Sequence, residues 1–266
     1  MSFALGDVII DRIQYAWAEN FEGTLPLYVL TQLSEASIEL SAESKDAVDK
    51  DGTLVKRFWQ GKTGTFTATN AMLSMPVVAS MSGVTPDIVS NGQINGNAGT
   101  LTMPKIITVE SGKEITLTGV VEGTIHVAEL TTSGAMGAVM EAGASSTATS
   151  YVFVNDTKKL TAPTNPGKQY IVKYNRTVSN GAIIHNQADK FPQTVRLYLK
   201  CLAVDPCSAD TLKALYVELP SFQPSPETTI NFTTDGTLDY SGDLQVDYCS
   251  VNKSLFNLYW CDDDEE

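Results

Sequence analysis

The sequence predicts a mainly β protein, with a β-sandwich or barrel-like architecture and one short helix. Short stretches in which apolar and polar residues alternate are typical of half-buried strands. Turn-forming residues, chiefly glycine, asparagine and aspartate, separate these stretches at short intervals. The chain has 266 residues, 42% of them hydrophobic and 18% charged, which is enough to build one large β domain with a sizeable insertion.

The first 33 residues are rich in apolar side chains but show no clean periodicity. Ile9, Ile10, Ile13, Tyr15 and Trp17 fit neither a helical nor a strand template along their length. Two interpretations stay open for this segment. It is either an arm that packs on a neighbouring molecule, or the first strand or short helix of the same core.

The clearest local pattern begins at residue 37. Ile38, Leu40 and Ala42 alternate with polar neighbours, as a half-buried strand requires. Asp51-Gly52 then predicts a turn with positive φ. We expect a second and a third strand to follow this turn.

A short apolar helix is expected after these strands. Thr69 or Asn70 is predicted to be its N-cap, because their side chains can accept hydrogen bonds from the first free backbone N–H groups. Gly83 is predicted to mark its end. The whole block contains no pattern that points to catalysis.

The remainder of the chain predicts more strands and an insertion. Residues 84–98 are rich in asparagine and glycine and predict a loop, whereas residues 135–142 predict one or two helical turns. No linker separates two independent domains. We expect residues 1–98 and 166–266 to form the β core, and residues 99–165 to form an insertion or small β subdomain.

The charge excludes conventional nucleic-acid binding. The formal net charge is -13 and the isoelectric point about 4.5, whereas proteins that bind phosphate use lysine and arginine. Five of the acidic residues form the C-terminal run from Asp262 to Glu266, which predicts a solvated tail. No apolar run approaches the roughly 20 residues of a membrane span, and no signal peptide is evident, so we expect synthesis in the cytoplasm and no membrane partner.

The search for catalytic and metal sites finds no convincing set. The two histidines, His126 and His185, have no second ligand at helical spacing, and neither a GxSxG elbow nor a phosphate-binding glycine loop is present. The DKDG sequence at residues 49–52 fails as a calcium loop, because Ala47 and Phe58 occupy two ligand positions. We therefore predict no catalytic residue, no cofactor and no metal.

The four cysteines lie in the last quarter of the chain, at positions 201, 207, 249 and 261. They form no CxxC pair of the kind that binds zinc. A reducing compartment disfavours disulfides, so we expect free thiols. A Cys201–Cys249 pair across neighbouring strands stays open as an alternative.

Phe58 and Trp59 follow Lys56 and Arg57 and form an aromatic and cationic cluster. Because side chains alternate along a strand, the two rings should point to opposite faces. One interpretation places one ring in the core and the other at its rim. The other makes the pair an anchor between subunits, because aromatic residues and arginine are enriched at such contacts.

Two blocks of the chain resemble the tail tube proteins of long-tailed bacteriophages. The first covers residues 38–83: a strand, the acidic DKDG turn, strands ending in FTATN, then a short helix and a glycine. The second covers residues 167–250 and includes GKQYIVKYNRT, FPQTVRLYLKCLAVD and YVELPSFQPSPETTINFTTDG. Together they span a little over half the chain, and the motifs describe topology and turns. The middle region departs from the shortest members of that family.

The resemblance implies a structural virion protein located in the phage tail. Such subunits form hexameric rings that stack into a hollow tube, contact other tail proteins, and let DNA pass without specific binding. An acidic lumen would repel DNA, and alternate strand residues near Glu39 and Glu43 are the candidate lumen acids. The candidate subunit interface comprises Asp49, Asp51, Gly52, Phe58 and Trp59.

Three other functions compete with the tail tube. A phage head decoration or another virion β protein would suit the middle region. A carbohydrate-binding β-sandwich module would use Trp17, Trp59 and Trp260 as stacking platforms, provided that they are exposed on one face. An enzyme is the remotest alternative, because no catalytic constellation is evident.

Overall fold

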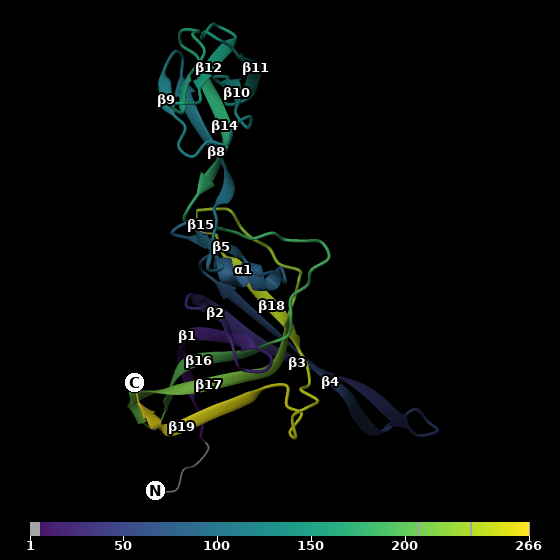
Figure 1. The fold of residues 1–266 in the computed structure, drawn as a ribbon. Coiled ribbons are helices and arrows are strands. Elements are labelled where there is room, and N and C mark those ends of the chain that lie inside the picture. Colours follow the sequence, from purple (N-terminus) through teal and green to yellow (C-terminus); the bar gives the residue numbers. More distant parts are fainter. Residues whose placement is uncertain (1–5, 207, 235, 266) are drawn as a thin grey trace. The chain divides into compact units, whose positions relative to one another are not determined.

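The computed structural model describes residues 6–206, 208–234 and 236–265, and the side chains of 208–210 and 261–265 are left out. The chain divides into two compact units. Unit 1 comprises Met1–Pro86 and Ile184–Glu266, and unit 2 comprises Asp87–Ile183. The chain therefore leaves unit 1, builds unit 2, and returns to complete unit 1 (Figure 1).

Within its described residues, unit 1 contains one helix and the strands of a single sheet. Its elements are β1 (Ile9–Asn20), β2 (Pro26–Leu30), β3 (Leu33–Val48), β4 (Leu54–Asn70), α1 (Met75–Met81), β16 (Val195–Asp205), β17 (Ser208–Pro224), β18 (Leu238–Leu244) and β19 (Asn257–Glu265). The main strand order is β2-β1-β16-β17-β18-β4-β3, and β19 also pairs with β17. Both halves of this curled sheet contribute to one hydrophobic core. The prediction of a mainly β, barrel-like fold with one short helix is confirmed.

Alternation along residues 64–70 of β4 separates the core from the surface. Phe66 and Ala68 are buried, whereas their neighbours Thr65 and Thr67 are exposed. β18 repeats this pattern, with Leu238 and Tyr240 buried. Because successive side chains of a strand point to opposite faces, each strand presents one apolar face and one polar face.

Four aromatic side chains form the centre of this core. Phe66 and Phe222 meet edge to face with their ring centroids 5.7 Å apart, and Tyr240 lies within 6.3 Å of both. The buried hydroxyls of Tyr28 and Tyr240 are 2.5 Å apart and share a hydrogen bond. Burial raises the pKa of Tyr28 to about 12, so both hydroxyls stay protonated at neutral pH.

The helix forms where the sequence predicts it, but its cap differs. α1 begins after Ser74 with a proline in its first turn, whereas Thr69 and Asn70 are the last residues of β4. The predicted N-cap is therefore wrong. Gly83 follows the helix with φ +65, and a Cβ there would lie 2.1 Å from the carbonyl oxygen of Phe191, so only glycine fits.

Two further local predictions are corrected in unit 1. The second and third strands expected after Asp51-Gly52 are one strand, β4, which has an irregularity near Gly61 at φ +61. The open question about the N-terminal segment is also settled, because β1 pairs with β16 inside the main sheet. Cys201 is buried and Cys249 is exposed, and both are free thiols, whereas the side chains of Cys207 and Cys261 lie outside the described residues.

Unit 2 has its own sheets and core. Its strands are β5 (Asp87–Ser90), β6 (Gln93–Ile94), β7 (Asn97–Ala98), β8 (Leu101–Glu110), β9 (Glu114–Thr116), β10 (His126–Leu130), β11 (Met136–Ala142), β12 (Ser150–Val154), β13 (Lys159–Thr161), β14 (Gln169–Val178) and β15 (Gly181–Ile183). One sheet has the order β8-β14-β10-β11-β12-β13-β9 and the other β15-β5-β6-β7. Tyr170, Val172 and Tyr174 of β14 are fully buried in its core.

Sequence reasoning misassigned two segments of unit 2. Residues 84–98, expected to be a loop, contain the short strands β5, β6 and β7. Residues 135–142, expected to be helical, form the strand β11 between β10 and β12. Both segments are rich in small or turn-forming residues, and pairing with distant strands determines their conformation.

Candidate functional site: an acidic strand face and a projecting hairpin

The polar face of three neighbouring strands forms a regular array of acids and hydroxyls. On β3, β4 and β18 the register aligns three rows of side chains. The rows are Glu35-Thr69-Asp239, Ser37-Thr67-Ser241 and Glu39-Thr65-Asp243. We call these nine residues the acidic face. Four carboxylates occupy its corners, and no lysine or arginine stands at any of its positions.

The acidic face is held rigidly by the strands that carry it. The hydroxyls of Ser37 and Thr67 share a hydrogen bond of 2.7 Å across β3 and β4. On the opposite face of the same strands, the side chains of Phe66 and Tyr240 are buried and pack in the core of unit 1. The four acids are solvent-exposed on a surface that the strand pairing preforms.

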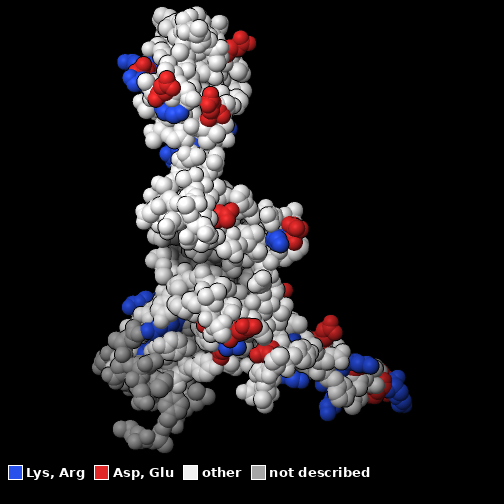
Figure 2. Space-filling model, in the orientation of Figure 1, with Lys and Arg blue, Asp and Glu red and all other residues white. Residues whose placement is uncertain are grey.

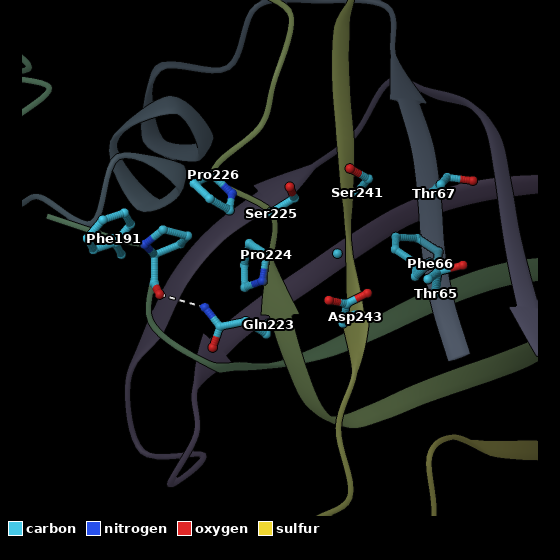
Figure 3. A pocket seen from close by; sticks show the side chains of 12 residues that line it. Thr65, Phe66, Thr67, Phe191, Gln223, Pro224, Ser225, Pro226, Ser241 and Asp243 are labelled. Carbon is cyan, nitrogen blue, oxygen red and sulfur yellow. Dashed lines mark hydrogen bonds between the residues drawn. The ribbon is translucent and has the colours of Figure 1, made fainter. Parts of the chain in front are cut away.

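A shallow groove runs along the β18 edge of the acidic face. Figure 3 shows Ser241 and Asp243 on β18 beside Thr65 and Thr67 on β4. On its other side the groove is bounded by Pro224 and Pro226 and by the loop that carries Phe191. Gln223 connects these parts, because its side-chain nitrogen donates to the carbonyl oxygen of Pro192 at 2.6 Å.

The far part of the hairpin formed by β3 and β4 projects from the core. Every residue from 41 to 63 is exposed, and the strands pair only with each other in this stretch. We call residues 41–63 the arm. Figure 1 shows it extending away from the sheet, and Figure 2 shows basic and acidic side chains gathered along it. An isolated two-stranded hairpin is only marginally stable in water, so the arm lacks the packing that stabilises the rest of unit 1.

Large apolar side chains are exposed along this arm. Phe58 is 51% exposed and Trp59 is 65% exposed. Lys45 is the strand partner of Phe58 and Ser44 that of Trp59, so the two rings lie on opposite faces. The interpretation that one of them belongs to the subunit core is wrong, because the arm has no core beneath either face.

Cations lie close to both rings. The amino group of Lys56 is 5.2 Å from the centre of the Phe58 ring, and the guanidinium of Arg57 is 5.7 Å from that of Trp59. Arg57 also donates two hydrogen bonds to the carboxylate of Asp46, at 2.7 and 2.9 Å. These bonds hold the pKa of Asp46 below its ordinary value, so this ion pair persists at mildly acidic pH.

The tip of the arm is the predicted acidic turn. The Asp49 carboxylate accepts hydrogen bonds from the backbone N–H groups of Asp51 and Thr53, at 2.9 and 2.8 Å. Gly52 takes φ +82, which confirms the predicted positive-φ turn. Asp49, Asp51 and Gly52 therefore form one structural feature, separated along the arm from Phe58 and Trp59.

The structure separates the two candidate lumen acids. Glu39 belongs to the acidic face, whereas Glu43 lies on the arm beyond the irregularity in strand pairing, opposite Gln60. Sequence reasoning missed Glu35, Asp239 and Asp243, which complete the acidic face. Acids alternate with apolar residues in LDYSGDL, the sequence of β18, and this pattern indicates a strand with an acidic face. It does not indicate which strand lies beside β18, because the pairing of β18 with β4 joins residues more than 160 positions apart.

The three tryptophans do not form a common platform. Trp17 neighbours Tyr198 on one face of the sheet, whereas Trp260 packs against the cluster of Cys201, Ala203 and Leu215 on the other. Trp59 lies on the arm. A carbohydrate-binding face built from these three rings is therefore excluded by their positions.

In the described ranges, no three histidine, cysteine, aspartate or glutamate side chains converge to hold a metal ion. The part of the chain that the structure describes also has no helix long and apolar enough to cross a membrane.

The sheet carries one polar, acidic strand face and an arm that no other part of unit 1 supports. Comparison with known families gives the class of protein. A family model described as the YomU/Tube protein family matches residues 9–253, so the chain belongs to this family. The match confirms the resemblance to phage tail tube proteins and defines a tube-type structural protein. No curated protein matches the chain.

Proposed function

We propose that this protein is the subunit of a phage tail tube, in which hexameric rings stack around a channel lined by the acidic face. The observation that carries this proposal is the array of four carboxylates without a basic residue among them. DNA moving through the channel meets carboxylates that repel its phosphates, and the acidic face offers no lysine or arginine that would bind phosphate and release its counterions. The genome therefore passes without being retained.

The arm supplies a contact between copies of the chain. Its exposed apolar residues Phe58 and Trp59, each beside a cation, have the composition of an interface centre. A neighbouring subunit would supply the packing that this two-stranded hairpin lacks. The acidic turn at Asp49, Asp51 and Gly52 would then reach an adjacent subunit at the end of the arm.

Unit 2 has a different place in the proposal. It has its own core and is inserted between α1 and β16 of unit 1. Unit 1 alone carries the acidic face and the arm, so we assign unit 1 to the tube wall and unit 2 to a decoration of the subunit. The role of the assembled protein is structural, within the virion tail and in contact with other tail proteins.

Charge reversal on the acidic face tests the channel assignment. In phage carrying Glu39→Lys with Asp243→Lys, tubes should form normally, because both side chains are exposed and have no core contacts. DNA ejection should fall about tenfold or more, since two new cations per subunit bind phosphate in every ring. Ejection is measured as DNA released on receptor contact, and tube length by electron microscopy.

Two matched variants serve as controls for this experiment. Glu39→Gln with Asp243→Asn removes the same charges without adding cations. Glu141→Lys with Asp156→Lys adds the same charge at exposed positions of unit 2, outside the acidic face and the arm. Both should eject DNA nearly as wild type does. Normal ejection from the reversed face, with intact tubes, would contradict the channel assignment.

A further inference from the structure

One edge of β17 is covered by two different strands. β18 pairs with its C-terminal end, Phe222–Pro224, whereas β19 pairs with the stretch from Lys213 to Glu218. Among the described residues β19 pairs with no other strand. Without β19, this stretch of β17 would present a row of unpaired backbone N–H and C=O groups, which is a template for a strand from another chain.

A few side-chain contacts hold β19 in this position. The Glu218 carboxylate accepts hydrogen bonds from the amide of Asn257 at 2.9 Å, from the hydroxyl of Tyr259, and from Tyr198 of β16 at 3.2 Å. Trp260 packs against Cys201 and Leu215. Tyr259 itself is 49% exposed, and its neighbour Leu258 is 60% exposed, so much of the strand remains in contact with water.

The opposite edge of the same part of the sheet is formed by β1. Among the described residues, β2 pairs with β1 only from Ala16 onward, and the stretch from Ile9 to Ile13 pairs with β16 alone. Ile9 and Ile10 are each 56% exposed there. A head-to-tail ring needs two such edges, one on each side of the subunit, and this sheet offers β1 on one side and β17 on the other.

We infer that β19 is a guard strand, which covers the β17 edge until a second copy of the chain adds its β1 edge there. The inference rests on the proposed tube function. Its physical basis is competition, because β19 and an incoming strand would form backbone hydrogen bonds with the same groups of β17. The sequence of β19 ends in Asp262-Asp263-Asp264-Glu265, and charge of this kind on an edge strand opposes further strand addition.

Two variants that weaken or remove the guard strand test this inference. The first ends the chain after Phe256, which keeps the residues that pack on the main core. The second, Asn257→Ala with Tyr259→Phe, removes two of the donors to Glu218 and leaves the chain length unchanged. Both should assemble at about tenfold lower protein concentration than wild type, a shift worth about 1.4 kcal/mol.

Assembly is measured by light scattering, with electron microscopy of the products. The matched control is Asn252→Ala with Tyr248→Phe, the same two changes in the exposed segment before β19, which should assemble as wild type does. Circular dichroism checks that each variant folds, and if the shortened chain does not fold, the double substitution decides. Variants that are folded but need the same or a higher concentration would overturn the inference. If the variants fail in this way but the wild-type protein forms tubes, the inference about β19 is wrong and the tube function stands. If neither the wild-type protein nor any variant forms tubes, both proposals are wrong.

Discussion

Replacing both Phe58 and Trp59 by alanine is expected to abolish tube formation while leaving the subunit folded. The two rings are more than half exposed in the subunit, so their removal should change its free energy of unfolding by less than about 0.5 kcal/mol. At an interface centre, each aromatic side chain contributes about 2 kcal/mol or more. The concentration needed for assembly should therefore rise by about 1,000-fold, which places it beyond practical reach.

Sedimentation measures assembly of this variant, and denaturant unfolding measures its stability. Ser44→Ala is the matched control, because Ser44 is the strand partner of Trp59 on the same arm but has a small side chain. It should assemble normally. Assembly of the double variant at the wild-type concentration would show that the arm is not a contact between copies.

The second large effect is expected at Phe66, in the strand that separates the core from the acidic face. Phe66→Ala removes a ring that is 1% exposed and contacts Phe222 and Tyr240, so unfolding should become easier by about 3–5 kcal/mol. Thr65→Ala, one position earlier, should cost less than about 1 kcal/mol, because its side chain points to solvent. Denaturant unfolding of both variants measures the difference.

The contrast between these neighbours tests the register of β4 directly. A one-residue shift would exchange the two faces of the strand. Similar losses of stability for the two variants would therefore contradict the separation of core and acidic face on which the channel assignment depends.

Local patterns in the sequence are sufficient to predict the class of fold and several of its parts. The strands β3 and β4, the positive-φ turn at Gly52 and the helix that ends before Gly83 all depend on residues close together in the chain. The predicted half-buried face of β3 is right for Ile38 but wrong for Leu40 and Ala42, which are exposed because the strand leaves the core there.

The wrong N-cap has a simple cause. Thr69 and Asn70 have the chemistry of a cap, but both still pair with β3 and β18, so β4 continues to Asn70. The helix therefore begins after Ser74, four or five residues later than expected.

The acidic face could be predicted only in part. Glu39 was identified because it alternates with apolar residues in one strand. Asp239 and Asp243 join it through pairing of β18 with β4, and no local feature of the sequence specifies that register. Dependence on distant strands also explains why β11 was not predicted. This segment is rich in small residues, and it is a strand because it pairs with β10 on one side and β12 on the other.

Electron cryomicroscopy of the purified protein, assembled at high concentration, tests the central claim most directly. The account predicts stacked rings with a channel of uniform bore, in which Glu35, Glu39, Asp239 and Asp243 of every subunit line the wall. A protein that stays monomeric at every concentration, or a tube that carries these four carboxylates on its outer surface, would contradict it.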